Sequence, residues 1–133
     1  MKIVIDTNVI LSGIFWKGPP EKILRLWDNG HFELLISAPV FAEYQEVARR
    51  LLQKYERPAI DKVLENIFIR SHLINPTRIK TPSCEDVDDV MFLELAITGG
   101  AEYLVSGDKH LLKVGKYAGG EIVTPGSFVS LLS

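Results

Sequence analysis

The stretch "KIVIDTNVIL", residues 2–11, decides the fold and raises the question of function. Ile3-Val4-Ile5 predicts a buried strand, because a short continuous apolar run is typical of a strand covered on both faces. Val9-Ile10-Leu11 predicts more of the core. Asp6 stands between the two apolar runs, where a charge is costly unless another group compensates it. An Asp at a strand end, followed by Thr-Asn inside an apolar run, has no turn to form. We therefore look for a chemical role for Asp6.

The length and composition predict one globular domain over residues 1–133. The chain has 133 residues, of which 47% are hydrophobic and 24% charged, and this balance argues against disorder. The longest run without a charge is far too short for a membrane span. Asp6 interrupts the apolar run that could act as a secretory signal, so we expect a cytoplasmic protein without a membrane partner.

The scarcity of sulfur and imidazole restricts the metals that the chain can bind. One cysteine, Cys84, excludes a disulfide framework and a zinc site built from cysteines. The histidines His31, His72 and His110 stand far apart in no ligand-like spacing. Any metal would have to be held by oxygen, which favours Mg²⁺ or Mn²⁺ over Zn²⁺.

The charge balance does not indicate a general nucleic-acid binder. The net charge is −2 and the isoelectric point is near 5.9. Local basic clusters do occur, at Arg49, Arg50, Lys54 and Arg57, and at Lys109, Lys113 and Lys116. Each cluster has two interpretations, a basic face for a partner or the solvated surface of an ordinary helix.

Short apolar runs alternate with helical periodicity, which predicts an α/β layer with parallel strands. Strands are expected at 2–6, 33–37, 72–74, 103–106 and 121–124. Helices are expected at 19–27, from 38 onward, from 58 onward and at about 86–98. The last of these helices is apolar almost all round, which is typical of a helix buried inside the domain.

Acidic residues occupy positions that a parallel sheet can bring together. Asp6 and Asp108 follow predicted strands, and ligands of such sheets bind beyond the carboxyl ends of the strands. Glu43 lies beside the apolar stripe of its helix and can point into a cleft. Further acids open the buried helix, namely Asp86, Asp88 and Asp89.

Each acid also has a structural interpretation when taken alone. Asp86 and Asp88 can cap a helix, with Ser83 and Asp86 resembling a capping box. Asp108 can shape a turn with Gly107, and Glu43 can be a surface residue. Together, however, carboxylates about 4 Å apart would repel by roughly 4 kcal/mol at an effective dielectric constant near 20. One or two Mg²⁺ or Mn²⁺ ions would remove this penalty and would activate water for phosphodiester cleavage.

The amino-acid sequence does not support several other classes of site. An EF-hand loop starting at Asp86 would need Gly where Met91 stands and Glu where Ile97 stands. The chain has no P-loop, no dinucleotide fingerprint and no G-x-S-x-G elbow. A receiver-type acidic pocket would need paired acids after the first strand, and "IVIDTNV" has one.

The motifs, taken in order, resemble a PIN-domain ribonuclease over nearly the whole chain. The resemblance is carried by "VIDTNVILSGIF", by Glu43 in "SAPVFAEYQEV", by "EDVDDVMFLELA", and by "YLVSGDKHLL" followed by "EIVTPGSFVSLL". Within that family, the chain is similar to the toxin components of bacterial and archaeal toxin–antitoxin pairs. The resemblance implies a Rossmann-like α/β/α sandwich with a central parallel sheet.

The resemblance also implies the site. Asp6, Glu43, Asp89 and Asp108 would hold Mg²⁺ or Mn²⁺ and would be the catalytic residues. Asp89 is preferred over Asp88 because the family's acid stands seven residues before a small residue, here Ala96. The positions that would support the pocket are Asn8, Ser106 and Asp88.

One feature departs from the family pattern. Many relatives carry a further acid shortly after the position of Asp108, where this chain has Lys109-His110-Leu111. This departure implies a second metal that is weaker or bound only with substrate. His110 would either contact a phosphate or be an ordinary surface residue.

The function implied by the resemblance is a metal-dependent endoribonuclease that leaves a 5′-phosphate and a 3′-hydroxyl. Two alternatives stay open, a nuclease of the same chemistry that acts on single-stranded or branched DNA, and a catalytically silent module that binds RNA or protein. The implied partners are an RNA substrate, a cognate antitoxin and a second copy in a homodimer.

Overall fold

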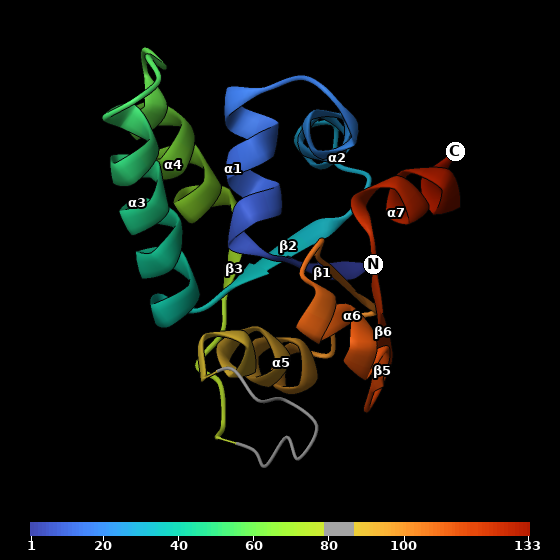
Figure 1. The fold of residues 1–133 in the computed structure, drawn as a ribbon. Helices are drawn as coiled ribbons and strands as arrows, with labels where there is room; N and C mark the ends of the chain where they lie inside the picture. The colour runs from blue at the N-terminus through green and yellow to red at the C-terminus, as the bar shows by residue number, and fades with distance from the viewer. Residues whose placement is uncertain (79–86) are drawn as a thin grey trace.

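Parallel strands form one sheet with β1 and β4 at its centre, so the carboxyl ends of these strands lie at the same edge of the sheet (Figure 1). The computed structural model describes residues 1–78 and 87–133. The strands are β1 Lys2–Ile5, β2 Glu33–Ile36, β3 His72–Leu73, β4 Tyr103–Val105, β5 Lys116–Tyr117 and β6 Gly120–Val123. The helices are α1 Thr7–Phe15, α2 Pro19–Asp28, α3 Ala38–Leu52, α4 Ile60–Arg70, α5 Val87–Gly99, α6 Lys109–Val114 and α7 Pro125–Leu132.

The sheet has the order β3-β2-β1-β4-β6-β5 and is mostly parallel. β1 pairs in parallel with β2 and β4, β2 with β3, and β4 with β6. β5 runs antiparallel to β6 at one edge. The predicted α/β class is therefore confirmed, with the single departure that its last strand pair is a hairpin.

Helices cover both faces of the sheet, which explains why β1 and β2 are continuous apolar runs. α5 packs against β1, β2 and β4 on one face. Figure 1 shows α1, α2 and α7 on the opposite side. Ile3-Val4-Ile5 and Leu34-Leu35-Ile36 are at most 1% exposed, as expected for strands between two helical layers. Within the described ranges, no helix is both long and apolar enough to cross a membrane.

Helix α1 was not predicted, although it directly follows Asp6. The expectation that Asp6 has no turn to form was wrong, because β1 leads straight into α1 and the Asp6 carbonyl accepts hydrogen bonds from the N–H groups of Val9 and Ile10, both at 3.1 Å. The buried residues of α1 cover most of its circumference and leave a narrow face at Asn8, Ser12 and Phe15, so the amphipathic period is weak. The buried residues are Thr7, Val9, Ile10, Leu11, Gly13 and Ile14.

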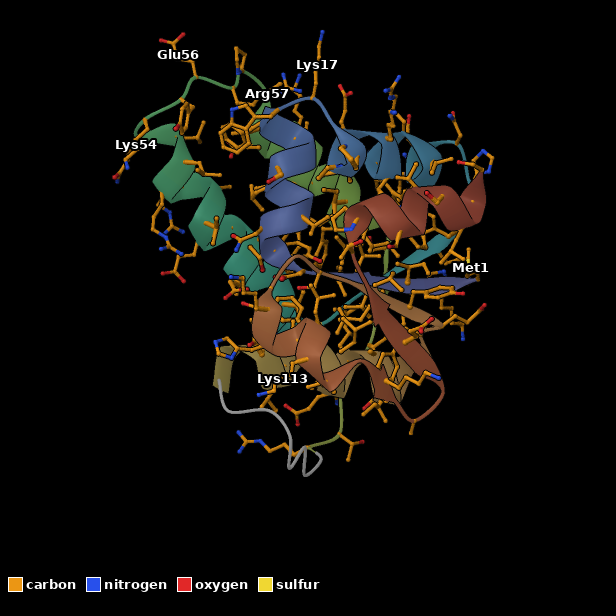
Figure 2. All side chains as sticks on the ribbon, turned by 45° about the vertical axis from the view of Figure 1, so that its right-hand side comes forward. Met1, Lys17, Lys54, Glu56, Arg57 and Lys113 are labelled. Carbon is orange, nitrogen blue, oxygen red and sulfur yellow. The ribbon has the colours of Figure 1, made fainter. Side chains whose placement is uncertain are left out.

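Close packing and a side-chain cap hold α1 in place. A Cβ added at Gly13 would lie 2.7 Å from the carbonyl oxygen of Pro20, so the absence of a side chain lets α2 approach. At the same C-terminal end of α1, Arg57 Nε–H donates to the Ile14 carbonyl at 2.8 Å. Figure 2 shows Arg57 beside this end of α1, on the same side of the molecule as Lys17. The orientation of α1, and thus of Asp6 at its start, is fixed by these contacts.

The other predicted elements are confirmed with small shifts of their ends. The strands predicted at 33–37, 72–74, 103–106 and 121–124 correspond to β2, β3, β4 and β6, and the four predicted helices to α2, α3, α4 and α5. The helices α6 and α7 and strand β5 were not predicted. The suggested capping pair Ser83 and Asp86 lies outside the described residues.

Candidate active site

The topology places Asp6 next to Ser106 at the carboxyl ends of β1 and β4. β2 pairs with one side of β1 and β4 with the other, so the strand order reverses between β1 and β4. Ligands of open α/β sheets bind at such a reversal. The parallel register sets Ile5 opposite Val105, and the next residues on the two chains are Asp6 and Ser106. Strand pairing thus joins segments that are far apart in the sequence.

The Ser106 hydroxyl connects two of the predicted site residues. It donates to Asp6 Oδ2 at 2.6 Å and accepts from the backbone N–H of Asp108 at 3.0 Å. Ser106 is fully buried and Asp6 is 7% exposed, so the hydrogen bond between them is shielded from water. The hydroxyl therefore orients the Asp6 carboxylate and also the backbone that carries Asp108.

The four predicted acids line one cavity of about 270 Å³. They come from different elements, Asp6 from the end of β1, Glu43 from α3, Asp89 from α5, and Asp108 from the segment after β4. Asp89 is 7% exposed, like Asp6, so two of these carboxylates are buried. The side chain of Asp88 lies outside the described residues. The predicted set Asp6, Glu43, Asp89 and Asp108 is thus brought together around a single cavity.

Contacts around the first turns of α3 position Glu43. The Ser37 side chain caps this helix by accepting from Val40 N–H at 3.3 Å. The buried Tyr44 hydroxyl donates to the Ile5 carbonyl at 2.5 Å, which ties α3 to the end of β1. The Thr7 hydroxyl then donates to the Glu43 carboxylate. Glu43 is therefore held against the strand end rather than displayed on the surface.

Asp108 has two roles at once. Its Oδ1 accepts hydrogen bonds from the N–H groups of His110 at 2.7 Å and Leu111 at 3.2 Å, so it caps the short helix α6. The same side chain lines the acidic cavity. The structural and functional interpretations of Asp108 are thus compatible, because a carboxylate has two oxygens and several acceptor positions.

Negative charge accumulates in this cavity. Burial raises the pKa of Asp6 above its usual value, and the Asp108 carboxylate raises it further. The hydrogen bond from Ser106 and the backbone N–H groups of Thr7 and Asn8 act in the opposite direction on this pKa. Burial, together with the nearby Asp6 and Glu43 carboxylates, also raises the pKa of the Tyr44 hydroxyl well above its ordinary range. Both pKa shifts follow mainly from burial, and the neighbouring carboxylates add to them.

The donor set fits a hydrated divalent cation bound through oxygen. Of the described residues that line the cavity, Arg50 alone is positively charged, and it is exposed. Across the described part of the chain, no three His, Cys, Asp or Glu side chains are placed to hold a metal ion together. Mg²⁺ needs no closed cage, because it usually keeps several waters and uses one or two carboxylates plus substrate phosphates. The carboxylates around this cavity match that mode of binding.

Sequence reasoning missed two functional positions and underestimated a third. Thr7 gave no signal, because its partner Glu43 is 36 residues away. Tyr44 gave no signal either, because it is fully buried as a core residue is, yet its hydroxyl also anchors the strand end. Arg50 belonged to a basic cluster with two interpretations, and its place seven residues after Glu43, two helical turns away, could have indicated a common face.

The raised pKa of Asp6 predicts a pH-dependent stability. A folded-state pKa above the usual 3.8 means that ionisation of Asp6 opposes folding. The stabilisation that protonated Asp6 contributes is complete below pH 3.8 and is lost as pH rises through the folded-state pKa. In EDTA at neutral pH, Asp6→Asn is therefore expected to melt at or above the wild-type temperature, because an amide oxygen can still accept from Ser106. The advantage should shrink toward pH 4. Thermal denaturation between pH 4 and 8 measures it, and a constant loss of stability at every pH would contradict the prediction.

Comparisons in sequence and in structure show which known proteins are similar to this chain. The family model described as "PIN domain" matches residues 2–110. No curated protein matches the chain in sequence. A chain in the crystal structure of VapBC2 from Rickettsia felis, bound to a DNA fragment from its promoter, has a similar fold with a TM-score of 0.57. It is 17% identical, and the alignment covers 93% of this chain and 98% of that one.

Proposed function

The chain belongs to the PIN-domain family, and from this premise we propose that it is a metal-dependent endoribonuclease, the toxin of a toxin–antitoxin pair. The proposed reaction is hydrolysis of an RNA phosphodiester to a 5′-phosphate and a 3′-hydroxyl. An oxygen–phosphorus bond forms from water, the bond from phosphorus to the 3′-oxygen breaks, and that oxygen takes up a proton.

One observation carries the proposal, namely that carboxylates from separate elements line one cavity at the strand-order reversal. Hydrophobic burial alone would not gather them there, because each ionised group opposes its own burial. Two of these acids, Asp6 and Asp89, are 7% exposed and face the same cavity as Asp108 and Glu43. A site that binds a cation during its reaction explains this arrangement.

Each acid has a proposed role. Asp6, Asp89 and Asp108 would hold the cation, directly or through its coordinated waters, and Glu43 would hold it or orient the attacking water. When bound, Mg²⁺ or Mn²⁺ supplies an activated water at neutral pH and stabilises the charge on the phosphate and the leaving oxygen. The Thr7 hydroxyl holds Glu43 in position, and Ser106 holds Asp6. The exposed Arg50 offsets the repulsion between the acidic cavity and the RNA backbone.

Incubation of end-labelled single-stranded RNA tests the proposal. Cleavage is expected with Mg²⁺ or Mn²⁺ and is expected to stop in excess EDTA. The products should carry 5′-phosphates, which a phosphate-dependent exonuclease degrades. An absence of cleavage with both metals would contradict the proposal.

The same assay separates the alternatives when a DNA strand of matched sequence is digested in parallel. Faster cleavage of DNA would identify a DNA nuclease with the same chemistry. Binding that is indifferent to EDTA, without cleavage of either strand, would identify a silent binding module. The retained acids around the cavity support the hydrolytic alternatives over the silent one.

The proposed protein partner is an antitoxin that covers the acidic cavity. The structural likeness to a chain of VapBC2 supports this partner. Co-expression of the chain with a candidate small partner should yield a complex in which RNA cleavage is inhibited. A homodimer also stays a prediction, and light scattering of the purified protein would measure it.

Replacement of Ser106 by Ala is expected to slow cleavage by about 10- to 100-fold, the usual cost of losing a group that orients a metal ligand. The hydroxyl joins Asp6 to the Asp108 backbone, so both acids lose a restraint. Steady-state cleavage well below the melting temperature measures the effect. Ser130→Ala, on the exposed side of α7, is the control. Equal rates for the two variants would show that Ser106 does not position the site.

A further inference from the structure

A second and larger cavity adjoins the acidic one. It has a volume of about 560 Å³, within the range of pockets that hold small organic ligands. Asn8 and Asp108 line both cavities, so the two share a wall. The other walls come from α1 at Ser12, from the start of α2 at Pro20, and from the start of α7 at Pro125. The second cavity is therefore the space that a polymer leaving the acidic cavity on this side would enter.

The charged side chains that line the second cavity differ from those that line the acidic cavity. The acidic cavity has Asp6, Glu43 and Asp89 in addition to the shared Asp108, whereas Asp108 is the sole acid among the described residues that line the second cavity. Its lining otherwise includes the ammonium group of Lys109 and the imidazole of His110.

Lys109 and His110 are available to a ligand. Both are exposed, and neither takes part in an ion pair within the described part of the chain. The hydrogen bond that His110 donates to Asp108 comes from its backbone N–H, so the imidazole ring takes no part in it. An ammonium group and an imidazole at the rim of a cavity beside the proposed cleavage site can both donate hydrogen bonds to a neighbouring phosphate.

The remaining lining offers a place for a base. Val9 and the rings of Pro20 and Pro125 supply apolar surface, while Asn8 and Ser12 supply polar atoms that can hydrogen-bond a base edge or ribose. A base can enter such a cavity only when it is unstacked, which is easy in a single strand and costly in a duplex.

We propose that this second cavity is a nucleotide subsite that receives the nucleotide next to the scissile phosphate of single-stranded RNA, with Lys109 and His110 contacting the adjacent phosphate. The inference rests on the proposed nuclease function, since the acidic cavity supplies the position of the scissile phosphate. It assigns a role to the segment Lys109-His110, where the chain departs from its family's pattern, namely substrate binding rather than metal binding.

The test compares Lys109→Ala/His110→Ala with Lys113→Ala. Lys113 has the same charge on the same helix but does not line the cavity, and Figure 2 shows it on the side of α6 away from α1. Fluorescence anisotropy of a short labelled single-stranded RNA, in Ca²⁺ and in EDTA, measures affinity. Steady-state cleavage in Mg²⁺ or Mn²⁺ separates kcat from KM.

The double variant is expected to raise Kd and KM on the order of tenfold with kcat nearly unchanged, because phosphate contacts act on binding rather than on chemistry. The slope of log affinity against log salt should become less steep by about 0.7 for each lost contact with a single strand. Ser12→Met, which fills part of the cavity without altering charge, should raise KM as well, and its melting temperature checks its fold. Lys113→Ala should behave as wild type.

The outcomes distinguish the inference from the function on which it rests. If wild type cleaves RNA but the double variant matches Lys113→Ala in KM and salt slope, the subsite is refuted and the nuclease stands. If wild type binds RNA without cleaving it and the double variant loses affinity, the nuclease is refuted and the binding role of Lys109 and His110 stands. If wild type neither binds nor cleaves RNA, both are refuted.

Discussion

Asp6→Asn and Asp89→Asn are each expected to reduce RNA cleavage by on the order of 10³-fold while the protein stays folded. Loss of a metal-binding carboxylate removes several kcal/mol of transition-state stabilisation, and each 1.36 kcal/mol is a factor of ten in rate. Both side chains are 7% exposed and line the same cavity, so an isosteric amide changes the charge of the site with little change in packing.

The controls for this prediction address folding and charge separately. Circular dichroism should match that of wild type and the melting temperature should be no lower, and Asp6→Asn retains an oxygen that accepts from Ser106. Asp61→Asn replaces an exposed acid in the first turn of α4 that does not line the cavity; this variant loses the same charge and should cleave at the wild-type rate. Full activity in both Asp6→Asn and Asp89→Asn would refute the assignment of the site.

Phe128→Ala is expected to lower the free energy of unfolding by about 3–5 kcal/mol, the usual cost of removing a buried aromatic ring. Phe128 is fully buried in α7, with ring centroids 5.4 Å from Phe32 and 5.9 Å from Tyr103. The family match ends at residue 110, so this prediction concerns a helix beyond the matched region. We expect α7 to be part of the cooperative core rather than an appendage.

Urea denaturation measures this prediction, and Leu131→Ala is its control. Leu131 lies in the same helix and is 53% exposed, so its truncation should change the free energy of unfolding by about 0.5 kcal/mol or less. Below its melting temperature, Phe128→Ala should cleave RNA at nearly the wild-type rate, because Phe128 does not line the acidic cavity. A loss of less than about 1 kcal/mol on truncating Phe128 would show that α7 packs loosely.

Elements with a one-sided or a continuous apolar pattern were predictable. Ile3-Val4-Ile5 and Leu34-Leu35-Ile36 form strands covered on both faces, and α3 shows the expected apolar stripe. Helix α1 was not predictable in this way, because α2, α3 and the sheet surround it and leave a polar face only as wide as Asn8 and Ser12. Helix α6 and strand β5 are too short for periodicity to decide.

The sequence alone determined the alternation of strands and helices, the restriction to oxygen ligands, and the acids that could form a site, because residue type and local periodicity depend only on near neighbours. Only the tertiary structure decided which of these side chains meet. The register of β1 with β4 joins Asp6 to Ser106, and the packing of α3 joins Thr7 to Glu43. The same folding sets the two cavities side by side across Asn8 and Asp108. These contacts depend on strand register and helix packing between distant segments. The periodicity of a local stretch of sequence does not encode either of them.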